Sequence, residues 1–160
     1  MMDPMAMLPQ GRSRETKLRR DALGRWFDGE TQITHVLLTQ AFDAWVDRAE
    51  DGRFCLKNDV NWAYVEIEGP PVFVRSSTIR GATVTLHLSD RREEVLDVTT
   101  LREGRDGALY CQVREGRLPA RFDAHAALQL SPLLGEDEEG TYLELGQVRI
   151  RPKIVEDPLA

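Results

Sequence analysis

The stretch between residues 25 and 56 constrains the fold of this chain more than any other, because it combines strand, turn and helix signals. The aromatic pair Trp26-Phe27 precedes Asp28-Gly29, and an Asp-Gly pair readily takes the positive-φ positions of a tight hairpin turn. A second acidic-glycine pair, Asp51-Gly52, precedes an apolar Phe-x-Leu segment. We therefore expect an aromatic strand, a turn, an amphipathic helix, a second turn and a second strand.

The helix within this stretch is predicted from apolar residues that recur at helical spacing. They form one face and are Leu38, Ala41, Phe42, Trp45 and Ala49. Thr34 is the expected N-cap, because its hydroxyl can accept a hydrogen bond from an amide of the first turn. Gly52 is expected to follow the last turn in a left-handed conformation, which would end the helix there.

The rest of the chain alternates apolar and polar residues in short runs, which predicts β-strands. Between residues 60 and 68 the side chains of Ala63, Val65 and Ile67 are expected to face the core, so that Trp62, Tyr64 and Glu66 lie on the opposite face. Val84, Leu86 and Leu88 form a second inward set, as do Leu109, Cys111 and Val113 further on. A second, shorter helix is expected after Asp123, with Pro132 at its end.

These elements predict an α+β fold made of two β-rich halves with the same plan: strand, turn, strand, helix, strand. The glycine that opens each helical unit is followed by its closing glycine after 23 residues in the first half and 24 in the second. Coincidence is the alternative to duplication, because acidic-glycine turns after helices are common. The expected organisation is a flexible basic arm (1–24), a first half (25–100), a second half (101–153) and a tail (154–160), with the two halves packed as one compact protein.

Charge is distributed unevenly along the 160 residues. The first 25 residues contain six Lys/Arg and three Asp/Glu, a net charge of +3, and the remainder carries −9. Because nucleic-acid binding depends on neutralising phosphates, the acidic body makes nucleic acid an unfavourable partner, and only the basic arm could attract it weakly. No run reaches the roughly 18 apolar residues of a membrane span, and no signal peptide is recognisable. A soluble, cytoplasmic protein is expected.

Sequence motifs for catalysis, metal binding and cofactor binding are absent. The two cysteines lack C-x-x-C spacing, and the three histidines lack the i, i+4 spacing of a helical metal site. No glycine-rich phosphate loop is present, so we expect no cofactor. The alternative that remains open is an enzyme with a site between the halves that uses His35, Asp28 or Glu30, and Cys55. Cys55 is expected to point away from the apolar face of its strand, beside basic neighbours.

Trp62 and Tyr64, bordered by Glu66 and Glu68, are the most distinctive candidates for a functional surface. Aromatic residues with a polar rim are typical of interface centres. Cover by a helix of the same chain is the commoner alternative, because large apolar patches on monomers are rare. We therefore expect a non-enzymatic module, of a regulatory or signalling kind, that binds a protein or a small ligand. Its specific form is a homodimer through the face that carries Trp62, Tyr64 and Glu66.

Several of these residues also resemble a known bacterial family of unknown function, DUF1285. The resemblance is carried by Trp26-Phe27, Gly29, Ile33, Phe42 and the segment 51–56, Asp-Gly-Arg-Phe-Cys-Leu, together with 65–73. It covers most of residues 25–151 and implies a small α+β protein with two related halves and no established activity. The chain departs from the family at 58–62 and at Thr34-His35, so no functional residue is carried over.

Overall fold

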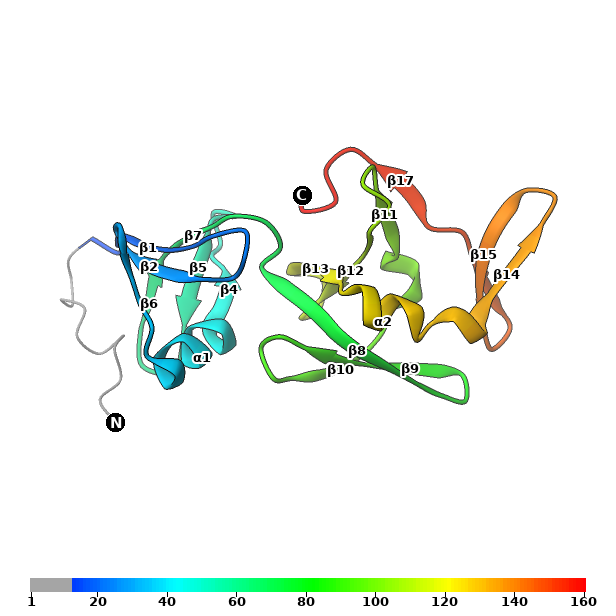
Figure 1. Cartoon of the computed structure of the whole chain (residues 1–160), viewed down its shortest axis with the longest axis horizontal. Coiled ribbons are helices and arrows are strands. Elements are labelled where there is room, and N and C mark those ends of the chain that lie inside the picture. The colour runs from blue at the N-terminus through cyan, green and yellow to red at the C-terminus, as the bar shows by residue number, and fades with distance from the viewer. Residues whose placement is uncertain (1–12) are drawn as a thin grey trace. The chain divides into compact units, whose positions relative to one another are not determined.

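The computed structural model describes residues 13–160, and their contacts divide the chain into two compact units (Figure 1). Unit 1 ends at Pro71 and unit 2 begins at Val72. The fold is mixed α+β and mostly β-sheet, with two α-helices. The sequence predicts halves that meet near residue 100, whereas this division lies after Pro71. It lies earlier because the hairpin that follows Pro71 pairs with a strand near residue 120, a long-range contact that local patterns do not reveal.

Unit 1 contains seven strands and one α-helix in its described part. In chain order these are β1 (Leu18–Arg20), β2 (Trp26–Asp28), β3 (Thr31–Gln32), α1 (Val36–Trp45), β4 (Val46–Arg48), β5 (Phe54–Lys57), β6 (Trp62–Tyr64) and β7 (Glu66–Ile67). One sheet has the order β3-β2-β1-β7, in which β1 and β7 are parallel, and the other is the antiparallel sheet β4-β5-β6. The predicted hairpin is present as β2–β3, with Gly29 at φ 61° in its turn.

Helix α1 differs from its prediction at both ends. Its N-cap is His35 rather than Thr34, and the His35 ring accepts a hydrogen bond from the Leu38 amide at 3.3 Å. The helix ends at Trp45 rather than near Gly52, because β-branched Val46 starts a strand that pairs with Leu56. Gly52, at φ 89°, instead occupies the turn of the β4–β5 hairpin.

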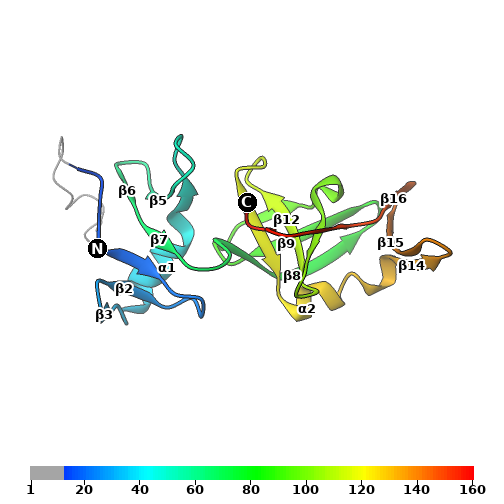
Figure 2. The ribbon, with the colours of Figure 1, turned by 90° about the horizontal axis from the view of Figure 1, so that it is seen from above.

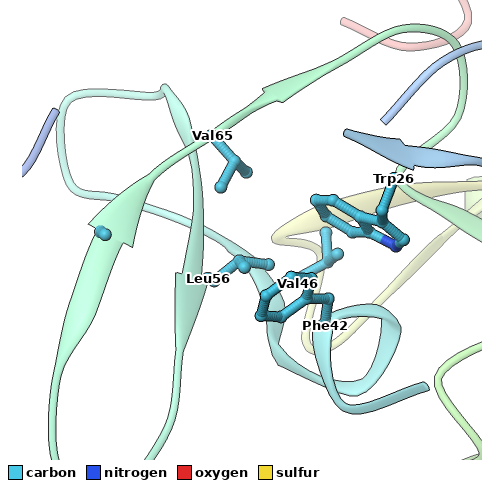
Figure 3. Packing of buried hydrophobic residues seen from close by; sticks show 6 residues of the cluster. Trp26, Phe42, Val46, Leu56 and Val65 are labelled. Carbon is cyan, nitrogen blue, oxygen red and sulfur yellow. The ribbon is translucent and has the colours of Figure 1, made fainter. Parts of the chain in front are cut away.

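The core of unit 1 forms between α1 and its two sheets (Figure 3). Its buried residues are Trp26, Phe42, Val46, Leu56, Ala63 and Val65. The rings of Trp26 and Phe42 meet edge to face with their centroids 5.2 Å apart. The inward assignment of Ala63 and Val65 is confirmed. Leu38 and Trp45, expected in the core, are only partly buried against it.

The segment predicted as a flexible arm contains a strand. Residues 1–12 lie outside the described part, but β1 pairs with both β2 and β7. Arg20 is 3% exposed, and its guanidinium donates to the carbonyl oxygens of Pro70 and Pro71 at 2.6 and 2.9 Å. It also donates to Asp43 at 3.1 Å. Arg20 thus binds β1 to the last two residues of unit 1, Pro70 and Pro71. Its place in a charged run does not suggest this role.

Unit 2 contains ten strands, one α-helix and two short 3-10 helices. In chain order they are β8 (Val72–Arg80), β9 (Thr83–Leu88), β10 (Glu93–Val95), η2 (Val98–Thr100), β11 (Arg102–Gly104), β12 (Leu109–Val113), β13 (Leu118–Phe122), α2 (Ala124–Leu128), η3 (Ser131–Leu133), β14 (Leu134–Asp137), β15 (Gly140–Leu145), β16 (Val148–Ile150) and β17 (Lys153–Val155).

The main sheet of unit 2 has the order β10-β9-β8-β13-β12-β11-β17, and α2 packs against β8 and β13 (Figure 2). Val84, Leu86 and Leu88 are at most 4% exposed, which confirms their predicted inward alternation. Asp123 is the N-cap residue of α2 as predicted, but its carboxylate accepts from Arg75 at 2.9 Å rather than from a helix amide.

The C-terminal part of unit 2 is more ordered than predicted. The acidic run 136–139 begins within β14 of the three-stranded sheet β14-β15-β16. The predicted tail contains β17, which pairs in parallel with β11, and Arg102 donates to the carbonyl oxygen of Pro158 at 3.0 Å. Tertiary pairing therefore orders segments that have little local signal.

The predicted duplication remains unconfirmed. Each unit places a helix after a hairpin, but α1 has ten residues and α2 has five. The strand pairings differ as well, since β2 pairs with β1 and β3, whereas β13 pairs with β12 and β8. Across residues 13–160 we find no helix with the length and apolar character that crossing a bilayer requires.

Candidate functional site

Trp62 and Tyr64 project from the same side of β6, because successive strand residues alternate and Ala63 between them is fully buried. Both aromatic side chains are half-buried. Their rings meet edge to face, with centroids 5.1 Å apart and planes at 84°. This geometry is favourable for aromatic pairs, so the two rings form one unit on the sheet surface.

A guanidinium group lies against each ring. Arg14 is 4.7 Å from the Trp62 ring centroid and donates to the Trp62 carbonyl oxygen at 2.7 Å and to the side chain of Asn61. Arg53 is 3.6 Å from the Tyr64 ring centroid. Such cation–π contacts hold a charged group against an aromatic surface. We call the surface formed by Trp62, Tyr64 and Arg53, over which Arg14 lies, the Trp62–Tyr64 face.

Two carboxylates, those of Glu15 and Asp51, bond to Arg53 and Tyr64 of this face. Glu15 accepts two hydrogen bonds from Arg53, at 2.6 and 2.8 Å, and this contact lowers the pKa of Glu15 and raises that of Arg53. The Tyr64 hydroxyl donates to Asp51 at 2.7 Å. That bond stabilises the charged carboxylate and the neutral phenol, so the pKa of Asp51 is lowered and that of Tyr64 is raised.

The structure brings together part of the predicted surface. Glu66 lies on β7, where it is exposed and pairs in register with Arg19. The rings are partly covered by residues of the N-terminal segment and the β4–β5 turn rather than by a helix. Arg53 lies directly before β5, the strand that pairs with β6, so a predicted β5–β6 pairing could have placed it near Tyr64. Arg14 is 48 residues from Trp62, and no local pattern links the two.

The residues of the predicted enzyme site lie on different elements of unit 1 or in the turns between them. His35 is the N-cap of α1, Asp28 ends β2, and Glu30 is exposed in the β2–β3 turn. Cys55 is 2% exposed and is not among the core residues that include its neighbour Leu56, so its side chain lies on the other face of β5 and is buried there.

The described arginines of the basic segment contact unit 1. Arg19 lies 4.2 Å from the Phe27 ring centroid and donates to the Gly29 carbonyl oxygen at 3.0 Å. Arg25 forms an ion pair with Asp21 at 2.7 Å. Together with Arg14 and buried Arg20, they hold the segment against the body of the unit. Arg12 lies outside the described residues.

Sequence analysis missed a buried ion pair in unit 2. Arg114 and Asp90 have side-chain exposures of 4% and 1%, and their charged groups are 2.7 Å apart. The Arg114 amide also donates to the carboxylate of Glu94 at 3.0 Å. Arg91, Arg114 and Glu115 all have positive φ. The pair joins the β9–β10 and β12–β13 turns, and its enclosed position identifies it as part of the internal structure of unit 2.

No group of three metal-binding side chains occurs within residues 13–160. A shallow hollow of about 340 Å³ lies on the β14–β15 hairpin, where it opens widely to solvent. Burial raises the pKa of the Cys111 thiol to about 12, so this side chain is a core residue, as its alternation predicted. The Trp62–Tyr64 face combines two aromatic rings in edge-to-face contact, two arginines and two carboxylates on the described surface.

Solved structures provide the informative comparison. A DUF1285 family protein from Silicibacter pomeroyi DSS-3 matches 92% of this chain and 85% of its own length, with a TM-score of 0.65 and 18% identity. The chain shares the DUF1285 fold. A DUF1285 family protein from Shewanella baltica OS155 matches 75% of this chain and 94% of its own length, with a TM-score of 0.58 and 15% identity. No family model matches the sequence, and no curated protein matches it.

The likeness to DUF1285 proteins agrees with the resemblance found in the sequence, and both describe a family of unknown function. At 15–18% identity the likeness concerns the fold alone. The proposed function therefore rests on the residues of the Trp62–Tyr64 face.

Proposed function

We propose that this protein is a non-enzymatic interaction module that binds a protein partner through the Trp62–Tyr64 face, with a second copy of the chain as the specific partner to test. One observation carries the proposal: an edge-to-face Trp–Tyr pair that remains half-buried on a sheet surface, with an arginine against each ring. Trp, Tyr and Arg are the residue types that dominate binding energy at protein interfaces.

The placement of the alternative candidates favours this proposal over an enzyme. A nucleophilic thiol must reach its substrate, whereas the Cys55 side chain is only 2% exposed. The His35 ring is used as a helix cap. The hollow on β14–β15 is shallow and lined by Leu134, Gly135, Glu136 and Thr141, so this hollow offers a small ligand little enclosure.

The proposal is tested by measuring molar mass with light scattering over a range of protein concentrations. We expect the wild-type chain to dimerise and Trp62→Ala to weaken dimerisation about ten-fold or more, as for an interface hot spot. Phe27→Ala is the matched control, because Phe27 is also half-buried against an arginine but is not part of the face. A monomeric wild-type chain, together with a Trp62→Ala variant that changes only stability, would contradict the homodimer.

A further inference from the structure

The exposed edge of β6 is occupied by the chain's own N-terminal segment. The Tyr64 amide donates to the Arg14 carbonyl oxygen at 2.9 Å, and the Thr16 hydroxyl donates to the Tyr64 carbonyl oxygen at 2.7 Å. Residues 13–17 form no regular strand, yet they satisfy both backbone groups of Tyr64 as an added strand would. The opposite edge of β6 pairs with β5. The segment therefore sits where an extended peptide could add to the sheet.

Side-chain contacts along this edge distinguish two consecutive positions. At the first, the Arg14 guanidinium lies against Trp62 and donates to the Trp62 carbonyl oxygen. At the second, the Glu15 carboxylate accepts two hydrogen bonds from Arg53, a charge-assisted bidentate contact. The edge thus has one position that suits an arginine and, next to it, one that suits a carboxylate.

We infer that the Trp62–Tyr64 face binds an extended peptide of a partner protein in which an arginine is followed directly by an acidic residue, and that Arg14–Thr16 is an internal occupant of the same site. The inference rests on the proposed function and specifies its partner. In peptide binding by strand addition, backbone hydrogen bonds supply affinity and side-chain positions supply specificity. The internal segment satisfies both requirements.

The internal occupant is held by contacts that cost little to break. Each of residues 13–17 is exposed or half-buried, and the Glu15–Arg53 pair has side-chain exposures of 57% and 50%. Ion pairs this exposed contribute little stability, and segments without buried apolar contacts open at low free energy. Arg20, buried and bonded to Pro70 and Pro71, keeps β1 in place. Among the described residues, opening is therefore confined to 13–17, which precede β1.

The test uses the full chain and a fluorescent peptide with the chain's own sequence from Gly11 to Leu18, GRSRETKL. Binding is followed by fluorescence anisotropy to the wild type and to a variant with both Arg14→Ala and Glu15→Ala. Because the internal segment competes with the peptide, we expect the variant to bind about ten-fold or more tightly than the wild type. Lys17→Ala, a neighbouring exposed substitution, is the control and should bind as the wild type does.

Specificity is tested with altered peptides and a second variant. Replacing the second arginine of the peptide with alanine should weaken binding to the double variant about ten-fold, because the contact with Trp62 is lost. Arg53→Glu places a carboxylate opposite Glu15, which opens the segment by repulsion. This variant should prefer the peptide GRSRKTKL to GRSRETKL, and it tests the inference independently if the double variant does not fold.

Two results would overturn the inference: no peptide binding by a folded variant with an open segment, or binding that is insensitive to the peptide's arginine and to the charge at residue 53. The outcomes separate this inference from the proposed homodimer. If the chain dimerises through Trp62 but no variant binds the peptide, the proposed homodimer is supported and the peptide-binding inference is wrong. If a monomeric chain binds the peptide, the protein-interaction function is supported and the homodimer is contradicted.

Discussion

Phe42 lies between the rings of Trp26 and Trp45, with centroid separations of 5.2 and 6.1 Å, and is 2% exposed. Phe42→Ala removes the ring and leaves a cavity that the surrounding sheets fill only in part. We expect the free energy of unfolding to fall by about 3–5 kcal/mol, measured by urea denaturation followed by circular dichroism.

Val36→Ala is the control for this measurement. Val36 is on the same helix but is 63% exposed, so its replacement should change the free energy of unfolding by less than about 0.5 kcal/mol. Equal effects of the two substitutions would show that the packing around Phe42 is not the source of the stability of unit 1.

The Tyr64–Asp51 hydrogen bond predicts a measurable pair of pKa shifts. Tyr64→Phe removes the donor, so the pKa of Asp51 should rise from its lowered value toward the ordinary aspartate range, as followed by carboxyl carbon NMR during an acid titration. Asp137, whose pKa is lowered by Arg151, is a carboxylate control that should be unaffected by this substitution. An unchanged Asp51 pKa in Tyr64→Phe would contradict the bond.

The same shifts set the direction of the acid response. Glu15 and Asp51 have folded-state pKa values below their unfolded ones, so each contributes stability above its unfolded pKa. That contribution is lost as the pH falls through the lowered pKa values. The Glu15–Arg53 ion pair and the Tyr64–Asp51 hydrogen bond should therefore weaken in acid, below the ordinary pKa range of these carboxyl groups.

At the scale of elements, the β12–β13 turn contains two left-handed residues with different roles. Arg114 has φ 51° and forms the buried pair with Asp90, whereas Glu115 has φ 58° and is exposed. We expect Glu115→Gly to stabilise the protein by about 0.5–1 kcal/mol, because glycine removes the left-handed strain at some cost in entropy.

Arg114→Gly should have the opposite effect at a comparable backbone conformation. It leaves the carboxylate of Asp90 buried without its guanidinium partner, and breaking a buried pair in this way costs about 3–5 kcal/mol. Both variants are compared by the same chemical denaturation. A stabilising Arg114→Gly would mean that backbone strain outweighs the buried ion pair.

Elements with a local periodic signal were predictable from sequence. Val84, Leu86 and Leu88 alternate in a single strand, and each is buried as the pattern predicts. The end of α1 was not predictable in the same way, because the apolar spacing continues to Ala49 while Val46 is drawn into a pair with Leu56. The end of α1 is set by tertiary strand pairing, which the apolar periodicity of the helix does not reveal.

At the scale of the whole molecule, long-range contacts also limit how much of the candidate site the sequence predicts. The sequence identified Trp62 and Tyr64 and the side of the strand on which they lie. It did not identify Arg14, because a contact over 48 residues depends on how the N-terminal segment returns to β6. It also assigned Arg20 to a flexible arm, although the folded chain buries this guanidinium against two proline carbonyls.

The division into two units follows from such long-range contacts as well. Strands β8 and β9 follow unit 1 in sequence but pair within the sheet of unit 2, through β13. Each described unit therefore has its own sheets and its own buried residues. The interaction proposed for the Trp62–Tyr64 face concerns unit 1.

The most direct test of that proposal is a dilution series of amide NMR spectra of the labelled full chain. We predict that resonances of residues 14–16, 53 and 62–64 shift as the concentration rises, and that Trp62→Ala abolishes these shifts. Concentration-dependent shifts confined to another exposed surface, such as Val36 and Leu37 on α1, would contradict the proposal. Spectra that do not change with concentration would contradict self-association through this face.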